Sequence, residues 1–553
     1  MLVPLLSIAS ICLQPFPVPW KASPSSLSTH LDVRLNTGIY RGVSTANATE
    51  KWLGIPYALP PVGDRRFSAP VPLPRIRWTA SGTMADKFGN ACPQPPADNL
   101  GAPISEDCLY LNVYRPEGTK ASDNLPVLFW IHGGAWTTGS GSLTSPRFDS
   151  DPTRIISRSV AMGKPLIYVS INYRLNTFGF LASARLSPSD LNAGFQDQQL
   201  ALRFVHDNIA AFGGDPDKVT LWGQSSGGGS VKAHFLYPLP GKPLFRAGIA
   251  NSDTGPFKNS PDASTYDKAG MPFDRLLHAT RCARVRDKMQ CLKEMPFQTL
   301  LNISNTMIES TLNMQLWEPA IGPPGSVFPE RAFTRMRRGD FLHLPYMAGT
   351  NLNEGTRLSI DVYNLSIGSP QEDAAFDSFV ARLLIDNSTL SSATLEHIRA
   401  LYPASDMRLG GPYHTGDSLF DRAAAWYGDE MYLGARRLFF DNAIGRQPLY
   451  AYHYQESIPG RDAYLGVAHG WELPLIFGPV PQGVNMTFAD QLLDYYVNFV
   501  NDMEPGGGWK VYSTDAKSVL QLRSVNLTMI PDDWDKKRTE YLWSQAVLDE
   551  FEK

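Results

Sequence analysis

The pentapeptide Gly223-Gln224-Ser225-Ser226-Gly227 carries the strongest chemical signal in this sequence of 553 residues. A G-x-S-x-G motif is typical of a sharp turn between a strand and a helix, where the serine hydroxyl is exposed and the glycines allow close backbone contact. The motif is short, but the apolar segment VTLW precedes it and the helix-compatible SVKAHFL follows it. We therefore predict that Ser225 is a nucleophile.

A serine hydroxyl needs a base to take its proton, and the base needs a carboxylate to hold its tautomer. Four histidines follow the motif at a sufficient distance, namely His397, His414, His453 and His469. His397 lies in a helical pattern and His453 in an aromatic strand pattern, which favours structural roles. His414 lies in a loop and stays possible. His469 lies in a loop just after the last predicted strand, so we expect it to be the base.

The surrounding segments predict the elements that must position these side chains. PVLFWI (126–131), PLIYVSINY (165–173) and AGIA (247–250) are apolar or aromatic runs of strand length. Residues 195–212 have apolar side chains at helical spacing, and Gly213-Gly214 ends the pattern. Strands and helices that alternate with short joints predict an α/β fold with a mostly parallel sheet covered by helices.

Two later segments, LPYMAGT (344–350) and LYAYHY (449–454), predict further strands of the same sheet. The span between them is largely helical and charged. No Ser/Gly linker, repeat or low-complexity tract marks a boundary in the sequence. We expect one large α/β domain over residues 23–553.

The composition limits the classes of function. Hydrophobic residues make up 43% of the chain and charged residues 19%, which is typical of a globular protein and not of a disordered one. Lys and Arg number 50 against 54 Asp and Glu, for a net charge of −4. Without a basic run, nucleic-acid binding and a polybasic membrane patch have no support.

The start of the chain predicts secretion. Its first 13 residues, MLVPLLSIASICL, are apolar, too short to span a bilayer, and followed by three prolines. They predict a signal peptide over residues 1–22. The alternative is an ordinary N-terminal strand. The polar end, WSQAVLDEFEK, indicates no membrane anchor. Six N-glycosylation sequons, of which about three are expected by chance, agree with this route; they begin at Asn47, Asn302, Asn364, Asn387, Asn485 and Asn526.

The five cysteines also bear on the compartment. Cys12 lies in the predicted signal peptide, which leaves two pairs that are close in sequence, Cys92 with Cys108 and Cys282 with Cys291. In an oxidising compartment we expect two small-loop disulfides. In a cytosolic chain these four residues would be buried free thiols.

Several longer segments resemble the type-B carboxylesterase/lipase family, a cholinesterase-like branch of the α/β-hydrolases, over nearly the whole chain after the signal peptide. The matching segments are GIPYALPPVGDRRFSAP from Gly54, SEDCLYLNVYRP from Ser105, HGGAW from His132, DQQLALRFVHDNIAAFGGDPDKVTLWGQSSGG ending at Gly228, GTNLNEGT around Glu354 and HGWELPLIFG from His469. Their order and spacing carry the resemblance.

The resemblance implies an α/β-hydrolase fold and a set of site residues. Ser225 would be the nucleophile, His469 the general base and acid, and Glu354 the carboxylate that orients the imidazole. The backbone N–H groups of Gly134, Ala135 and Ser226 would bind the oxyanion. Ser252 would support the histidine and the glutamate from behind. The family's chemistry takes an ester as its small-molecule partner, and we expect no metal and no organic cofactor. The oligomeric state stays open.

The chain departs from the family pattern at two positions. Asp253 stands where the family usually has glycine, and Gly322 stands where its P-V-x-D-G stretch has aspartate. Neither position is one of the three chemical residues. We therefore expect the catalytic set to be retained.

The segment between Cys92 and Cys108 bears on the substrate. It contains no aromatic residue to bind a quaternary ammonium, and Gln224 replaces the glutamate of cholinesterases, so choline esters are disfavoured. Its 15 residues are too few for a lipase flap, although closing the loop contributes about 3 kcal/mol of stability. We expect hydrolysis of small or moderately hydrophobic esters. The alternatives are a lipase, an acyltransferase with the same residues, or an inactive adhesion protein.

Overall fold

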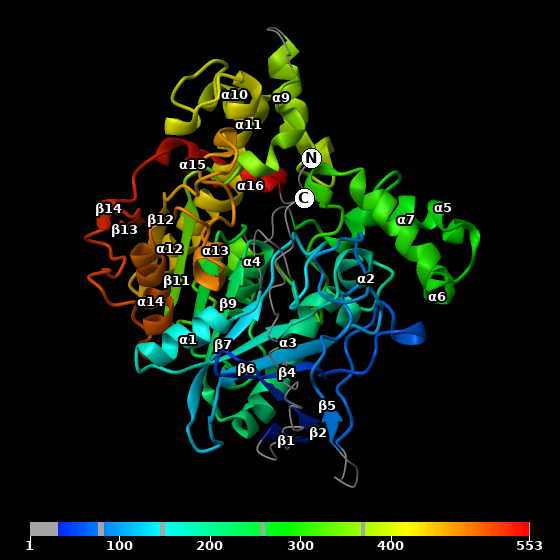
Figure 1. Ribbon diagram of the computed structural model, residues 1–553. Helices are drawn as coiled ribbons and strands as arrows, with labels where there is room; N and C mark the ends of the chain where they lie inside the picture. The colour runs from blue at the N-terminus through cyan, green and yellow to red at the C-terminus, as the bar shows by residue number, and fades with distance from the viewer. Residues whose placement is uncertain (1–30, 76–81, 144–149, 256–259, 366–370, 552–553) are drawn as a thin grey trace, which may run out of the picture.

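A large twisted sheet forms the centre of the molecule (Figure 1). The computed structural model describes residues 31–75, 82–143, 150–255, 260–365 and 371–551, so the predicted signal peptide and Cys12 lie outside the described residues. The described strands form an 11-stranded sheet in the order β14-β13-β12-β11-β10-β9-β7-β8-β6-β4-β3, and a small second sheet of β1, β2 and β5. The strands are β1 (Asp32–Leu35), β2 (Gly38–Arg41), β3 (Val43–Ser44), β4 (Thr49–Pro56), β5 (Thr83–Met84), β6 (Tyr110–Pro116), β7 (Leu125–Ile131), β8 (Ile167–Ile171), β9 (Gly214–Gln224), β10 (Ala247–Asn251), β11 (Tyr346–Asn351), β12 (Leu449–Tyr454), β13 (Ser518–Leu522) and β14 (Thr528–Pro531).

The central strands are parallel, as the sequence predicted. From β8 through β7, β9, β10, β11 and β12 to β13, each neighbouring pair is parallel. The outer strands β6, β4 and β3 at one edge, and β14 at the other, pair antiparallel. Because parallel strands are joined by crossovers, their carboxyl ends meet at one edge of the sheet, where ligand sites of α/β proteins lie.

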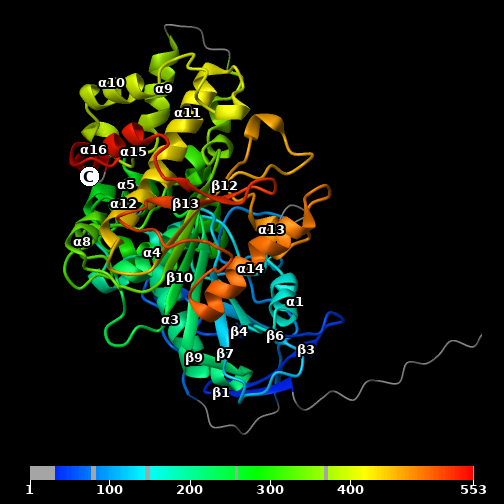
Figure 2. The same cartoon turned by 90° about the vertical axis from the view of Figure 1, so that its left-hand side faces the viewer.

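Helices cover both faces of this sheet (Figure 2). The central strands are apolar because both of their faces are buried. In β7, Phe129 packs in the hydrophobic core on one face of the sheet and Trp130 in the core on the other. The first core includes residues of α3 and α4, and the second includes residues of α1, α13 and α14. The helices are α1 (Thr153–Ala161), α2 (Asn176–Phe180), α3 (Ala193–Asn208), α4 (Ser226–Leu236), α5 (Pro272–Ala279), α6 (Lys288–Glu294), α7 (Phe297–Glu309), α8 (Ala332–Arg338), α9 (Gln371–Ala381), α10 (Ser392–Leu401), α11 (Ser418–Gly428), α12 (Gly434–Ala443), α13 (Leu473–Phe477), α14 (Met486–Asp502), α15 (Lys536–Leu542) and α16 (Gln545–Phe551).

Two long excursions leave the sheet. Helices α5–α8 follow β10, and helices α9–α12 follow β11; α5–α7 project to one side and α9–α11 to one end of the molecule in Figure 1. The cysteines pair as predicted, Cys92 with Cys108 and Cys282 with Cys291. The second disulfide therefore closes a loop within the first excursion.

None of the helices in the described ranges combines the length and the apolar character that crossing a bilayer requires.

Candidate active site

Ser225 lies at the tip of the turn between β9 and α4. Its backbone adopts φ +59° and ψ −127°, and its N–H donates to the carbonyl of Asn251 (2.9 Å). A Cβ at Gly223 would lie 2.3 Å from the backbone of Gly227, and a Cβ at Gly227 would lie 2.1 Å from the carbonyl oxygen of Ile131. Only glycine fits at either position, so the sequence motif follows from the packing of the turn.

His469 and Glu354 form a close hydrogen-bonded pair. His469 Nδ1 lies 2.6 Å from Glu354 Oε2, and both side chains are buried. The other carboxylate oxygen accepts from the hydroxyl of Ser252 and from the N–H of Asn351, each at 2.6 Å. A carboxylate held in this way fixes the proton of a neutral imidazole on Nδ1 and leaves Nε2 as the acceptor. Ser252, Glu354 and His469 follow the ends of β10, β11 and β12, respectively, as the sequence predicted.

Two further side chains contact His469. The amide nitrogen of Gln224 lies 3.0 Å from His469 Nε2, where it can donate to the ring. The ring of Tyr432 lies 4.6 Å from the ring of His469. The hydrogen bonds found among the described residues do not include a direct one from Ser225 Oγ to His469 Nε2. Such contacts commonly tighten only when substrate binds.

The loop after β7 presents free backbone donors beside Ser225. Gly134 has φ +112°, and a Cβ there would lie 2.2 Å from the carbonyl oxygen of Thr138. Across the described ranges, the N–H groups of Gly134, Ala135 and Ser226 donate to no other protein group. The N–H of Trp136 donates to Ser226 Oγ (3.2 Å), which ties this loop to the turn of the nucleophile.

His132 anchors the base of this loop. Its ring stacks on Tyr173 at 4.4 Å, and the Tyr173 hydroxyl donates to the His132 carbonyl (2.8 Å). Burial lowers the pKa of His132 to about 4, so its imidazole is neutral at physiological pH. His132 thus supports the loop as an uncharged group.

A cavity of about 570 Å³ adjoins these residues. Its walls include Gly134, Gln224 and His469, together with Met314 and Arg357 from the excursions. The first disulfide loop supplies another wall, through Gln94, Pro95, Pro96, Ala97, Asn99 and Leu100. The volume suits a small organic ligand.

Hydrogen bonds fix the disulfide loop against the oxyanion loop. Gln94 donates to the carbonyls of Cys92 (3.0 Å) and Gly139 (2.8 Å), and its side-chain oxygen accepts from the Gly139 N–H (2.8 Å). The Ser142 hydroxyl donates to the carbonyl of Leu100 (2.9 Å). The loop is therefore a fixed wall of the cavity.

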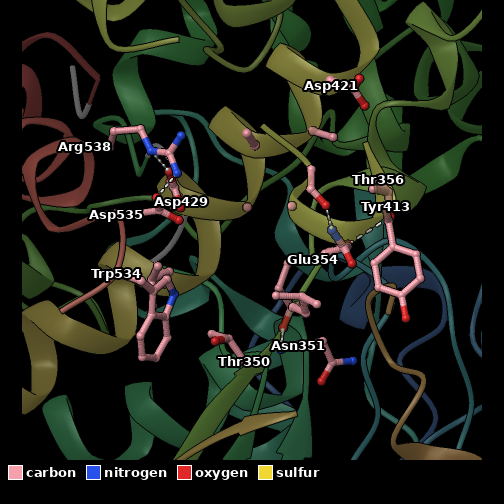
Figure 3. A pocket seen from close by; sticks show the side chains of 18 of the residues that line it. Thr350, Asn351, Glu354, Thr356, Tyr413, Asp421, Asp429, Trp534, Asp535 and Arg538 are labelled. Carbon is pink, nitrogen blue, oxygen red and sulfur yellow. Dashed lines mark hydrogen bonds and ion pairs between the residues drawn. The ribbon is translucent and has the colours of Figure 1, made fainter. Parts of the chain in front are cut away.

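A second, smaller cavity of about 150 Å³ includes Glu354 in its lining (Figure 3). Arg538 lies 3.0 Å from Asp429 and also pairs with Asp535. The Tyr402 hydroxyl donates to Asp429 (2.8 Å), and burial raises the pKa of Asp429 to about 7. The surroundings of Glu354 on this side are thus polar and hydrogen-bonded.

The structure explains both departures from the family pattern. The carboxylate of Asp253 is buried and lies 2.6 Å from the ammonium group of Lys232, with Tyr346 as a further partner (3.3 Å). At Gly322 a Cβ would lie 2.6 Å from Leu191 Cδ1, so an aspartate has no room there.

The other histidine candidates lie in different surroundings. His397 is exposed on α10 and stacks on Tyr541 (3.8 Å). His414 pairs with Asp421 (2.9 Å), and His453 is buried on β12. His469 alone among the four contacts Glu354 within the described residues.

Sequence reasoning did not find the roles of Asn351, Tyr432 and Glu472. Glu472 accepts from Asn351 (2.8 Å) and Asn251 (3.1 Å), and burial together with Glu354 raises its pKa. The HGWELP segment contained this residue, but no pattern indicated its partners. The six sequon asparagines are all exposed. Over the described ranges, no three His, Cys, Asp or Glu side chains converge as metal ligands would.

Comparisons with known proteins identify the family and the fold of the chain. The sequence model of the carboxylesterase family matches residues 29–539. The chain is 31% identical over 554 positions to Secreted lipase 1 of Botryotinia fuckeliana, covering 92% of each. It is 31% identical over 549 positions to Secreted triacylglycerol lipase LIP1 of Gibberella zeae, covering 91% of this chain and 88% of the relative. The crystal structure of Aspergillus niger EstA superimposes with a TM-score of 0.78 at 25% identity, covering 94% of this chain and 99% of EstA.

Proposed function

The chain belongs to the carboxylesterase family and has its α/β-hydrolase fold, and from this premise we propose that it hydrolyses carboxylic esters through Ser225, His469 and Glu354. One observation carries the proposal. Gln224 of the serine turn, Gly134 of the oxyanion loop and His469, which pairs with Glu354, all line one cavity.

The proposed mechanism is acyl transfer through a covalent intermediate. Ser225 Oγ attacks the ester carbonyl carbon while His469 Nε2 takes its proton, and the carbonyl oxygen becomes an oxyanion bound by the N–H groups of Gly134, Ala135 and Ser226. The C–O bond to the alcohol then breaks, and the alcohol oxygen takes the proton from Nε2. Water repeats these steps at the acyl carbon and releases the acid and Ser225.

The fixed disulfide loop supports small or moderately hydrophobic, water-soluble esters as substrates. Gln94 and Leu100 hold this loop in the cavity wall, so no long flap between Cys92 and Cys108 has to open for a substrate to enter. A cavity of about 570 Å³ accommodates a short acyl chain and a compact alcohol.

Lipase activity is the second candidate function. The observation that favours it is that both relatives reported above are named as secreted lipases. The same three residues would act, and the two candidates differ only in whether the substrate is dissolved or part of a lipid interface. An acyltransferase, in which another alcohol replaces water, would also use this site.

The first experiment tests the nucleophile. Ser225→Ala is expected to lower the turnover of p-nitrophenyl acetate by at least about 10⁴-fold, as loss of a triad member does. The matched control is Ser189→Ala on the exposed surface, which should retain full turnover. If Ser225→Ala keeps wild-type turnover with an unchanged far-UV circular dichroism spectrum, the assignment of Ser225 is wrong.

The second experiment separates the two substrate classes. A series of p-nitrophenyl esters of rising chain length is measured below and above the solubility limit of each ester. We expect the highest kcat/KM for short and medium chains, and no increase in rate when an emulsion forms. A sharp increase at the solubility limit would instead identify a lipase.

We also propose that the protein is secreted, as one catalytic domain over residues 23–553. The two disulfides, the exposed sequon asparagines and the names of the relatives support this route. N-terminal sequencing of protein collected from the medium is expected to begin near residue 23, and an intact Met1 in secreted protein would contradict the predicted cleavage.

A further inference from the structure

Lys232 and Asp253 place two opposite charges in the interior, close to the active site. Their side chains are each 1% exposed, and the ammonium nitrogen lies 2.6 Å from Asp253 Oδ2. The Tyr346 hydroxyl also lies 3.3 Å from this oxygen, whereas Asp253 Oδ1 has no hydrogen-bond partner among the described residues. Burial raises the pKa of Asp253, and the charge of Lys232 opposes this change. The charged form of the carboxylate therefore depends on Lys232.

A buried ion pair of this kind is a weak source of stability. Removing two charges from water costs free energy that their attraction only partly offsets, so apolar replacements are often equally stable. The pair nevertheless fixes the relative position of the two segments that carry it. The elements that Lys232 and Asp253 join therefore indicate what the pair does.

The first of these elements is α4, the helix that follows the nucleophile turn. Lys232 lies further along this helix than Ser226, whose backbone N–H belongs to the proposed oxyanion site. A Cβ at Gly228, one helical turn before Lys232, would lie 3.1 Å from Asp253 Cα, so α4 packs directly against Asp253. The ammonium group of Lys232 also donates to the Thr254 carbonyl (3.3 Å). Helix α4 thus holds both residues that follow Ser252.

The second element is α12. Lys232 donates to the Ala435 carbonyl in the first turn of this helix (3.5 Å). The π-helical turn Asp429–Leu433 leads into α12, and the indole of Trp543 anchors that turn at the Glu430 carbonyl (3.2 Å). The ammonium group therefore ties the nucleophile helix to a second helix whose start is itself anchored.

Ser252 lies directly before Asp253 and depends on this arrangement. Its φ of +46° lies in the left-handed region, which a residue other than glycine keeps only when its surroundings hold it there. On one side, the Ser252 N–H donates to the Gly349 carbonyl (2.9 Å). On the other side, the ion pair fixes Asp253. In this conformation the Ser252 hydroxyl donates to Glu354 Oε1 (2.6 Å).

We propose that Lys232 and Asp253 are positioning residues that act through Ser252. They orient its hydroxyl, which in turn holds Glu354 against His469. The proposal rests on the function proposed above, in which Glu354 orients His469 as the base. Within the described ranges, neither Lys232 nor Asp253 lines the active-site cavity. The pair therefore acts on kcat and leaves the binding of substrate unchanged.

A double-mutant cycle with Ser252→Ala tests the proposal. Asp253→Asn keeps the shape of the side chain and removes its charge. With p-nitrophenyl acetate, we expect Asp253→Asn to lower kcat about tenfold and to leave KM within about twofold. In the Ser252→Ala background, the same substitution should change kcat by less than about twofold, because the hydroxyl through which the pair acts is absent. Steady-state kinetics on the four proteins measure both factors.

Lys232→Met removes the other charge. Because burial raises the pKa of Asp253, its carboxyl group can then take up a proton, and no isolated charge stays in the core. We expect the same fall in kcat, again only when Ser252 is present. Lys232→Met decides the question if Asp253→Asn does not fold, and urea unfolding of each variant measures stability separately.

Glu50→Gln is the matched control for the loss of a buried charge. The pair of Glu50 with Arg115 (2.7 Å) is similarly buried, but it joins β4 to β6 near one edge of the sheet. Glu50→Gln should therefore keep the wild-type kcat. A fall in kcat equal to that of Asp253→Asn would show that any buried charge has this effect, and would overturn the proposal.

Other results would also overturn the proposal. The first is wild-type kcat in both Asp253→Asn and Lys232→Met. The second is a fall in kcat that is equally large in the Ser252→Ala background, because the pair would then act elsewhere. Failure of both variants to fold would show that the pair serves stability. Ser225→Ala is measured in the same assay: wild-type turnover there would refute the proposed function itself, whereas loss of turnover supports that function whatever the ion pair shows.

Discussion

At the scale of single residues, the site consists of hydrogen bonds in series. Ser252 holds Glu354, Glu354 holds His469, and Asn351 holds Glu354 through its backbone N–H. Each hydrogen bond restricts the rotation of the next side chain in the series. The imidazole of His469 therefore points its Nε2 in one direction. The outermost member of the series can therefore influence the reaction without contacting the substrate.

Ser252→Ala tests this at the outer end. The substitution removes the hydroxyl that donates to Glu354 at 2.6 Å and leaves the carboxylate with one fewer partner. We expect kcat/KM to fall by about tenfold to a hundredfold, since a hydrogen bond to a charged group contributes ~1.5–3 kcal/mol. Steady-state kinetics on p-nitrophenyl acetate measure this, with Ser189→Ala as control. Activity within twofold of wild type would mean that Asn351 suffices to hold Glu354.

Gln224→Glu tests the group beside the base. A carboxylate 3.0 Å from His469 Nε2 favours the protonated imidazolium, which cannot accept the proton of Ser225. We expect the acid limb of the pH profile of kcat/KM to move up by about 1 pH unit, while the plateau at higher pH is kept. Gln298→Glu, on the exposed surface of α7, should leave the profile unchanged. An unmoved acid limb in Gln224→Glu would show that residue 224 does not act on the base.

The residues that sequence reasoning found and missed differ in one respect. Ser225 and His469 stand out because the turn that exposes a nucleophile restricts the residue types around it, and because chain order restricts where the base can be. The contact between the rings of Tyr432 and His469 depends on a local π-helical turn, and the α-helical spacing of the segment does not reveal that turn. The Gln224 contact depends on a side-chain rotamer, which a sequence pattern does not encode.

At the scale of elements, the two disulfide loops differ in length and in place, with sequence separations of 16 and 9. The loop closed by Cys92 and Cys108 lines the active-site cavity, whereas Cys282 and Cys291 lie in the excursion after β10. Closing a loop restricts the unfolded chain in both cases. Only the first disulfide also fixes a wall against which the substrate binds.

Removal of each disulfide separates these effects. Cys92→Ala/Cys108→Ala and Cys282→Ala/Cys291→Ala are each expected to lower the free energy of unfolding by about 3 kcal/mol. The first variant should also raise KM severalfold, and the second should keep wild-type KM. Urea unfolding and steady-state kinetics measure the two effects. Equal KM values in both variants would mean that the hydrogen bonds of Gln94 hold the loop without the disulfide.

The strands that could be predicted are those buried on both faces. Strands β7, β10, β11 and β12, and the segment 219–222 of β9, are mostly apolar because a hydrophobic core lies on each side of them. Strands β1, β2, β3 and β5 have two to four residues and are only partly buried; β1 (DVRL) alternates, but four residues are too few to mark a strand. Their positions depend on pairing with distant segments.

At the scale of the whole molecule, buried histidines link stability to pH. His234 on α4 is 3% exposed, packs 4.5 Å from the ring of Phe195, and burial lowers its pKa to about 3. Its Nε2 has no hydrogen-bond partner in the part of the chain that the structure describes. In the unfolded chain its pKa returns to about 6.5. Its contribution to stability is therefore complete above pH 6.5 and is lost as the pH falls toward 3.

His234→Phe is expected to reduce this pH dependence. Between pH 7 and pH 5, His234 takes up a proton in the unfolded wild-type chain but stays neutral in the folded protein. This difference lowers the free energy of unfolding by about 2 kcal/mol. The variant cannot take up this proton, so its loss of stability over the same interval should be smaller by that amount. Denaturant unfolding at both pH values measures it. The exposed His278→Gln should match wild type, and a variant His234→Phe that also matches wild type would contradict the expectation.

The contact between Trp543 and the turn of Tyr432 has a consequence for biosynthesis. Trp543 lies 113 residues after Glu430, whose carbonyl its indole binds, and 74 residues after His469 (543 − 469 = 74). The ribosome therefore makes Ser225, Glu354 and His469 well before it makes the residue that anchors the turn. A nascent chain that stops short of Trp543 therefore contains the three residues proposed to be catalytic but lacks the anchor of the turn that lies against His469.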